Sequence, residues 1–428
     1  MKLKIFLILT GLLLFNFSEV YSQRTILHAG KLFDGRSDDI MYKMSIIIEE
    51  GRILKVSDGY EQPDPEDTVI DLKNKTVMPG LIDLHVHLEG ETSPTRYMDA
   101  FTLNDADKAY RSTLYAKRTL LAGFTTVREL GGTGVNISLR NAINEGFVDG
   151  PRIITVGKSI ATTGGHADPT NGWKHDLMGD PGPSLGVANG VDEARKAVRQ
   201  RYKNGADHIK ITATGGVLSV AKSGDAPQFF DDELKAIVET ARDYGMHVAA
   251  HAHGAEGMKR AVEAGVLTIE HGTKMTTEVM DLMIEKGAYY VPTITAGKWV
   301  AEKAKEDGYY PALVVPKALE IGPMIQNTFA EAYSRGVKIA FGTDAGVFPH
   351  GLNGQEFAYM AEAGMPVLES IKSATIIAAE VLGLQDEIGS IEAGKEADII
   401  AVDQNPVENI ETMTRVSFVM KGGKVYKQ

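Results

Sequence analysis

The residues best suited to chemistry in this chain are two closely spaced histidine pairs. His85 and His87 end an apolar run that starts at Leu81, and His251 and His253 follow a second apolar run. Because side chains alternate between the faces of a strand, His85 and His87 share one face. Two adjacent imidazoles are poor core residues and good ligands for a divalent metal ion. The alternative is a pair of hydrogen-bonded histidines at a strand end, since short motifs also arise by chance.

Three further ionisable residues lie on or after strand-like segments downstream. Lys210 is on the fourth such segment, His271 ends the sixth, and Asp344 follows the eighth. Burial favours the neutral amine of a strand lysine, which carbon dioxide can carboxylate into an oxygen ligand for two metals. The alternatives are that Lys210 extends to solvent and that Asp344 caps a turn. His251 is the better ligand candidate of the second pair, whereas His253 is expected in a loop, where it contacts substrate or has no special role.

The ligand types among these residues indicate which metal ions the site would bind. Imidazole and carboxylate donors, in a chain without cysteine, favour zinc, with manganese, cobalt, nickel and iron as alternatives. Two divalent ions about 3.5–4 Å apart can share a hydroxide and polarise a carbonyl. Asp344 would be the catalytic residue that takes the proton of the hydroxide and passes it to the leaving amine. The pattern therefore predicts a binuclear hydrolase that cleaves an amide or peptide C–N bond through a metal-bridging hydroxide.

Alternating strands and amphipathic stretches position these residues. Eight strand candidates occur, at 81–87, 124–129, 152–157, 207–213, 246–251, 266–271, 288–294 and 337–343. Eight parallel strands with crossover helices make an α/β fold of the (β/α)8 (TIM) barrel type, over residues 79–385, with its chemistry at the strands' C-terminal ends. A doubly wound open sheet is the alternative, although no glycine fingerprint follows the first strand. The long loop 161–190 is expected to cover the site.

The two ends of the chain have a different pattern, of short strands and turns. Glu50 and Gly51 separate two apolar runs and predict a hairpin turn. Neither end can bury both of its faces alone, so segments 23–78 and 386–428 are expected to pair into one small β-sandwich domain.

Residues 1–22 have the features of a secretory signal peptide. Lys2 and Lys4 precede an apolar stretch too short to span a bilayer, and small residues lead to Ser22. The protein is therefore expected to be exported to the periplasm or secreted, with an N-terminal anchor helix as the alternative. The net charge of -12, without a basic run, predicts no nucleic-acid partner and no stable membrane association. The expected partner is a small-molecule substrate, and a homo-oligomer is an open alternative.

Several segments give the chain a family resemblance. From the segment 77–83 (VMPGLID) to the segment 389–398 (GSIEAGKEAD), the sequence resembles the amidohydrolase superfamily. The resemblance is to the branch with imidazolonepropionase-like and Xaa-Pro dipeptidase-like (prolidase) enzymes, and it covers almost everything after residue 22. It implies two divalent metal ions in one site, whose ligands would be His85, His87 and Asp344 for one ion, His251 and His271 for the other, and carboxylated Lys210 as the bridge.

The same resemblance implies substrate-binding residues. His166, in the segment 163–168 (TGGHAD), would contact a carbonyl or carboxylate of the substrate. Arg128 matches another recurring position, where an ion pair with Glu129 or Asp83 is an equal alternative. Peptidases of this branch can carry a tyrosine at the position of His253, so the substrate is left open among dipeptides, N-acyl amino acids and cyclic amides.

Two other functions are compatible with such a barrel. A mononuclear deaminase of the superfamily should lack a ligand lysine on strand four and carry a glutamate after the strand-five histidine, where Glu256 is the nearest. A non-catalytic barrel should have lost metal ligands. Lys210 argues against the first alternative, and the complete ligand set argues against the second.

Overall fold

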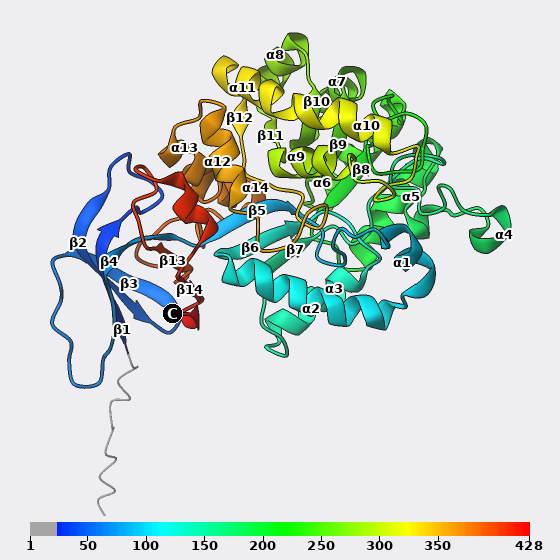
Figure 1. The fold of residues 1–428 in the computed structure, drawn as a ribbon. Helices are drawn as coiled ribbons and strands as arrows, with labels where there is room; N and C mark the ends of the chain where they lie inside the picture. Colours follow the sequence, from blue (N-terminus) through cyan, green and yellow to red (C-terminus); the bar gives the residue numbers. More distant parts are fainter. Residues whose placement is uncertain (1–23) are drawn as a thin grey trace, which may run out of the picture.

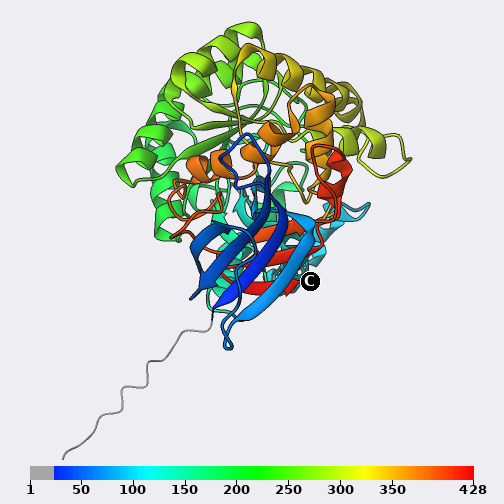
Figure 2. The same cartoon turned by 90° about the vertical axis from the view of Figure 1, so that its left-hand side faces the viewer.

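The computed structural model describes residues 24–428, so the predicted signal peptide lies outside the described residues. The fold is α/β, with a strand-rich unit beside a larger unit in which helices surround parallel strands (Figures 1 and 2). No helix within the described range is both long and apolar enough to cross a bilayer.

The two ends of the chain form one mixed seven-stranded sheet, in the order β15-β14-β13-β4-β1-β2-β3. The N-terminal and C-terminal segments meet in the middle of this sheet, where Ile399 of β13 pairs with Pro79 of β4 in an antiparallel register. The predicted hairpin turn is present, with Glu50 and Gly51 both at positive φ. The two-sheet sandwich stays a prediction. The strands are β1 (Thr25–Leu32), β2 (Met41–Glu49), β3 (Arg52–Asp58), β4 (Thr68–Pro79), β13 (Ile399–Val402), β14 (Phe418–Lys421) and β15 (Lys424–Lys427).

The eight predicted central strands are all present, and every pairing between them is parallel. They divide into a three-stranded sheet, β5-β6-β7, and a five-stranded sheet, β12-β11-β10-β9-β8. The last two strands are shorter than predicted. Beyond Ile339 the backbone still lies beside its neighbours, because the N–H of Ala340 donates to the carbonyl of Tyr290 at 2.9 Å and the N–H of Leu84 donates to the carbonyl of Phe341 at 3.0 Å. The bounds are β5 (Leu81–Val86), β6 (Phe124–Glu129), β7 (Arg152–Thr155), β8 (Ile209–Thr212), β9 (Val248–Gly254), β10 (Thr268–Lys274), β11 (Tyr289–Val291) and β12 (Lys338–Ile339).

Backbone bridges connect the edges of the two central sheets on both sides. Ile160 bridges to Ile211, and its N–H donates to the carbonyl of Lys210 at 2.8 Å. At the other end, the N–H of Asp344 donates to the carbonyl of His85 at 2.7 Å. These contacts bring residues from the first and last strands of the series next to each other. Asp344 and His85 are therefore neighbours although most of the chain separates them.

Helices lie outside the central strands and shield them from solvent (Figure 2). Aromatic rings fill the space between the layers, with Phe341 stacked on Phe124 at 5.7 Å and on Phe357 at 4.4 Å. The helices are α1 (Arg96–Thr102), α2 (Asp105–Leu121), α3 (Val135–Asn144), α4 (His175–Met178), α5 (Gly190–Lys203), α6 (Asp231–Asp243), α7 (Ala255–Ala264), α8 (Thr277–Lys286), α9 (Ile294–Lys303), α10 (Val315–Ile321), α11 (Ile325–Arg335), α12 (Gln355–Glu362), α13 (Val367–Ser373) and α14 (Ile376–Leu382). Three short 3-10 helices are η1 (Pro183–Leu185), η2 (Gly322–Met324) and η3 (Ile410–Thr414).

Candidate metal centre and substrate cavity

Asp83 fixes the backbone that carries the first histidine pair. Its carboxylate accepts hydrogen bonds from the N–H of His85 at 3.0 Å, from Thr343 Oγ1 at 2.6 Å and from Asn353 Nδ2 at 2.8 Å. Burial raises the pKa of this carboxyl to about 6, and the hydrogen bonds oppose that shift. Asp83 therefore joins the end of β5 to the segment that leads from β12 to Asp344.

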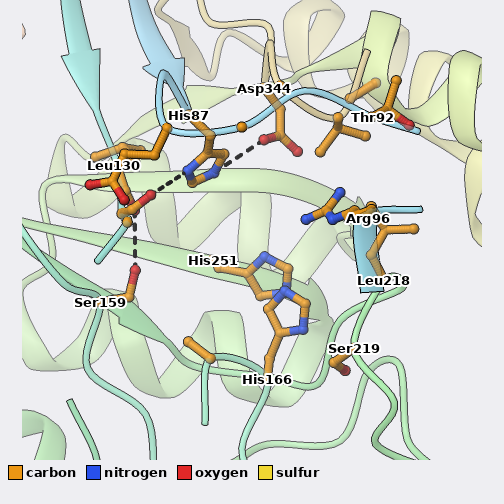
Figure 3. A pocket seen from close by; sticks show the side chains of 18 of the residues that line it. His87, Thr92, Arg96, Leu130, Ser159, His166, Leu218, Ser219, His251 and Asp344 are labelled. Carbon is orange, nitrogen blue, oxygen red and sulfur yellow. Dashed lines mark hydrogen bonds and ion pairs between the residues drawn. The ribbon is translucent and has the colours of Figure 1, made fainter. Parts of the chain in front are cut away.

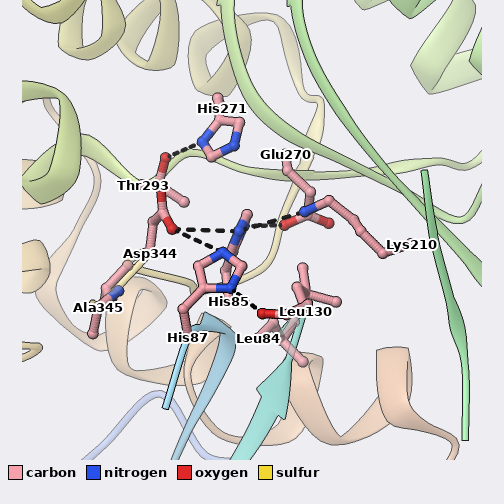
Figure 4. Close-up of polar contacts among 12 residues, drawn as sticks. Leu84, His85, His87, Leu130, Lys210, Glu270, His271, Thr293, Asp344 and Ala345 are labelled. Carbon is pink, nitrogen blue, oxygen red and sulfur yellow. Dashed lines mark hydrogen bonds and ion pairs between the residues drawn. The ribbon is translucent and has the colours of Figure 1, made fainter. Parts of the chain in front are cut away.

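Glu270, on β10, orients the ring of His85. His85 Nδ1 lies 2.9 Å from Glu270 Oε2, which leaves Nε2 facing the centre of the site (Figure 4). Glu270 also accepts hydrogen bonds from Arg128 Nη2 at 2.8 Å and from the hydroxyl of Thr268. Burial acts to raise the pKa of Glu270, but Arg128 and His85 outweigh it and lower the pKa to about 2. The carboxylate stays ionised and fixes the imidazole orientation that a metal ligand needs.

Asp344 faces both histidines of the first pair. Its Oδ1 lies 3.3 Å from His87 Nε2 and 3.6 Å from His85 Nε2 (Figures 3 and 4). The other nitrogen of His87, Nδ1, lies 2.8 Å from the carbonyl of Gly131. Asp344 is one of the few non-glycine residues with positive φ, at 62°, a strained conformation that is often found at functional sites. Its buried Oδ1 has no hydrogen-bond partner within residues 24–428.

His271 is oriented by the start of α9. Its Nδ1 lies 2.8 Å from Thr293 Oγ1, and Thr293 has a φ of 56°, which is unfavourable for a β-branched residue. Glu356 supports this turn, because it accepts hydrogen bonds from the N–H groups of Ile294 at 2.7 Å and Thr295 at 2.8 Å. The second ring nitrogen of His271 is thus left free to bind a metal.

His85, His271 and Asp344 fit a divalent metal ion. One ligand atom from each lies within 4.8 Å of the others, and all three residues are buried. Both histidines hold their outer nitrogen in a protein hydrogen bond. Asp344 Oδ1 makes no hydrogen bond within the described residues and lies at ion-pair distance from His85 and His87. This donor set of nitrogen and oxygen suits zinc and its neighbours in the first transition row.

Lys210 lies beside this cluster. Its Nζ is 3.4 Å from His85 Nε2, and only 4% of the residue is exposed. Burial lowers the pKa of the amine to about 8, and Glu270 and Asp344 oppose the shift. The lowered pKa increases the fraction of neutral amine, which is the form that could be carboxylated.

The second histidine pair and His166 extend the row of imidazoles. The ring of His251 is 4.7 Å from that of His271 and stacks on that of His166 at 4.3 Å. His251 Nε2 lies 3.1 Å from the carbonyl of Gly215. His251 is therefore near the cluster, but it is not one of the three residues whose ligand atoms all lie within 4.8 Å of one another. The expectation that His253 lies in a loop was wrong, because β9 continues to Gly254. His253 Nδ1 lies 2.9 Å from Thr273 Oγ1, at the wall of the cavity.

Arg128 lies behind the cluster instead of in the cavity. It is 3% exposed, its Nε donates to the carbonyl of Leu84 at 2.7 Å, and its Nη2 donates to Glu270. Its ion-pair partner is Glu270 and not Glu129 or Asp83, the partners named in the alternative to substrate binding. This position favours support of Glu270 and His85 over substrate binding.

A cavity of about 980 Å³ opens above the cluster. Its wall contains His85, His87, Lys210, His251, His253, His271, Asp344 and His166. The predicted covering loop 161–190 does contribute to the wall, through residues such as Trp173, whose ring stacks at 3.9 Å on Phe101 of α1. The volume exceeds that of the metal centre and leaves room for an organic substrate of moderate size.

Lys317, on α10, holds another part of the cavity wall. Its ammonium donates to the carbonyls of Gly216 at 3.0 Å, Ser219 at 2.8 Å and Ala221 at 2.9 Å. The loop it holds lines the cavity through Ser219 and its neighbours, and an added Cβ at Gly216 would meet the ring of His166 at 2.2 Å. Lys317 is therefore a positioning residue for the loop that packs against His166.

Lys317→Met should loosen this loop. We expect KM to rise roughly 10-fold with a smaller change in kcat, because hydrogen bonds to a charged group are each worth about 1.5–3 kcal/mol and none is made to the reacting atoms. Hydrogen exchange should speed up at residues 216–221. The control is Lys305→Met, which removes an exposed lysine that pairs only with Glu302. Unchanged exchange and unchanged KM in Lys317→Met would show that the loop holds its shape without this lysine.

Sequence reasoning missed the residues that support the ligands. Asp83, Glu270 and Glu356 are carboxylates that are fully or almost fully buried. Asp83 and Glu270 could have been noticed as the single acidic residues of the strand-like segments 81–86 and 266–271. Nothing local indicates that Glu270 bonds to His85, because the contact spans two distant strands.

The sequence and the structure together define the class of protein. Residues 76–426 match the model of the amidohydrolase family, and the chain belongs to that family. It is a hydrolase that acts on carbon–nitrogen bonds.

Individual relatives are similar over almost the whole chain. Ochratoxinase from Aspergillus niger is 32% identical, with 94% of this chain and 86% of the relative covered. A solved structure of a Xaa-Pro dipeptidase with methionine bound in its active site is 54% identical, with a TM-score of 0.93, and covers 95% of this chain and 100% of its own. A solved structure of a prolidase in complex with N-methylphosphonate-L-proline is 34% identical, with a TM-score of 0.87 and coverage of 95% and 100%.

Proposed function

We propose that this protein is a binuclear metal-dependent hydrolase that cleaves the amide or peptide C–N bond of small substrates, with dipeptides and N-acyl amino acids as the favoured classes. The observation that carries the proposal is the buried cluster of His85, His271 and Asp344, with Lys210 beside it, at the floor of a large cavity. The names of the relatives support it, since they include a Xaa-Pro dipeptidase, a prolidase and an ochratoxinase. Cyclic amides are a third substrate class.

Six residues would hold the metal ions, most favourably zinc. His85, His87 and Asp344 would bind one ion, His251 and His271 the second, and carboxylated Lys210 would bridge them. When bound, two such ions activate water and polarise the scissile carbonyl. The low pKa of Asp344, about 2, supports its role as a ligand, since burial is outweighed by His85, His87 and Lys210.

The chain's own residues would perform the proton transfer and hold the substrate. The carboxylate of Asp344 would take a proton from the attacking water and give it to the leaving nitrogen. His166 and His253 line the cavity, and burial lowers their pKa values to about 3 and 4. As neutral imidazoles, they can donate one hydrogen bond each to substrate carbonyl or carboxylate oxygens.

The deaminase alternative receives no support from Glu256. Its carboxylate binds Arg260 at 2.7 Å, and it is not among the residues that line the cavity.

The function is tested by metal analysis followed by a substrate screen. Purified protein should contain about two divalent ions per chain, and a chelator should remove both the ions and the activity. The screen compares dipeptides, N-acyl amino acids and lactams. Active enzyme without metal, or deamination without amide hydrolysis, would contradict the proposal.

Two structural interpretations accompany it. We interpret the eight central strands as a (β/α)8 barrel, because they follow one another in order and backbone bridges link β5 to the segment after β12 and β8 to that after β7. We interpret the terminal segments as a small β-sandwich, which their shared core of aliphatic side chains supports.

Export of the protein and cleavage of its signal peptide can also be tested. The mature N-terminus should begin just after Ser22, because a basic start, a short apolar core and small residues occur in that order. N-terminal sequencing of protein recovered from the periplasm or the medium measures this. Exported protein that still begins at Met1 would contradict cleavage.

A further inference from the structure

Arg96 has a charged side chain in the cavity without a partner. It is the first residue of α1 and lines the cavity, and in Figure 3 its guanidinium points toward the space between Asp344 and His251. Its Nη1 is buried and has no hydrogen-bond partner in the described part of the chain. No ion pair of Arg96 occurs there either, in contrast to Arg111 and Arg118 nearby.

Three carboxylates of the cavity wall bond to groups other than Arg96. Glu89 accepts hydrogen bonds from the N–H groups of Thr133 and Asn136, each at 2.7 Å. Asp99 pairs with Arg111 at 3.3 Å, and Glu91 pairs with Arg118 at 3.4 Å.

We infer that Arg96 is a specificity-determining residue, whose guanidinium binds a free carboxylate of the substrate. This inference rests on the proposed function. The physical reason is that a buried guanidinium nitrogen without an acceptor is costly, and a bound carboxylate would supply a charge-assisted hydrogen bond. Arg96 and Asp344 line the same cavity, so a substrate held by Arg96 would lie in the cavity that Asp344 also faces.

Lys158 is the other cation to consider. It lines the cavity, is half-buried and has no ion pair within the described range, and burial lowers the pKa of its amine. It follows β7, beside Ser159, which lies across the cavity from Arg96 in Figure 3. Lys158→Met is therefore a matched control that removes a cation from the same cavity.

The test compares a dipeptide with its C-terminal amide. Metal-loaded wild type should prefer the acid by about 100-fold in kcat/KM, the size expected for a buried charged pair. Arg96→Met should lower this ratio to near one, Arg96→Lys should retain part of it, and Lys158→Met should keep it. A preference that survives in Arg96→Met, or that is lost in Lys158→Met instead, would overturn the inference.

A binding measurement separates this inference from the proposed function. Calorimetry with the product amino acid and its amide should show tighter binding of the acid to wild type, and equal weak binding of both to Arg96→Met. If wild type hydrolyses acid and amide equally well, the proposed function stands and the role of Arg96 is wrong. If wild type hydrolyses neither, the proposed function is wrong and calorimetry alone decides the role of Arg96.

Discussion

Lys210→Ala is expected to lose most of the bound metal and nearly all activity. The substitution removes the amine that would be carboxylated, and with it the oxygen ligands shared by both ions. Lys210 is buried with its Nζ 3.4 Å from His85 Nε2, so the substitution acts directly beside the cluster. Elemental analysis and activity assays of the purified variant measure the two effects.

Short carboxylic acids should partly reverse the loss in Lys210→Ala. Formate or acetate can enter the space left by the side chain and supply bridging oxygens, so metal content and activity should rise together with acid concentration. Lys158→Ala is the control, since it removes a lysine from the same cavity without touching the cluster. A Lys210→Ala protein that binds two ions without added acid would show that Lys210 is only a structural lysine.

Asp344→Asn is expected to reduce kcat by roughly 10²–10⁴ while much of the metal stays bound, as for loss of a general acid–base group. Asparagine keeps an oxygen near His85 and His87 but cannot accept and return a proton. The measurements are kcat and metal content.

The control for Asp344→Asn is Asp99→Asn, which removes a carboxylate from the cavity wall without contacting the cluster. Full activity in Asp344→Asn would exclude the proposed proton transfer. Complete loss of metal would mean instead that Asp344 acts mainly as a ligand.

Much of the fold was predictable because its signals are local. Strand-like segments of six or seven residues marked all eight central strands, and the turn at Glu50 and Gly51 is visible in the sequence itself. The strand ends were less predictable. His253 lies on β9, because pairing with β10 extends that strand to Gly254, and such pairing is a tertiary effect.

The candidate site was predictable where it depends on residue type and was missed where it depends on contacts. His85, His271 and Asp344 were found from their positions at strand ends and Lys210 from its position within a strand, and the structure brings them together. The contact of Glu270 with both His85 and Arg128 joins three strands, and no spacing rule can show it. The same holds for Arg96, since its lack of a partner is apparent only when its surroundings are known.

The pairing of β4 with β13 has a consequence for synthesis of the chain on the ribosome. One side of β4 pairs with β1 as soon as both exist, but the other side must wait for β13, whose residue Val402 pairs with Thr76. For most of translation β4 is therefore an open sheet edge, which could recruit other nascent chains. Lys73 and Lys75 lie on that strand, and their charges would discourage such pairing until Asp403 arrives to bind Lys75. Lys75 would thus oppose pairing with other chains before β13 is made and binds Asp403 in the finished fold.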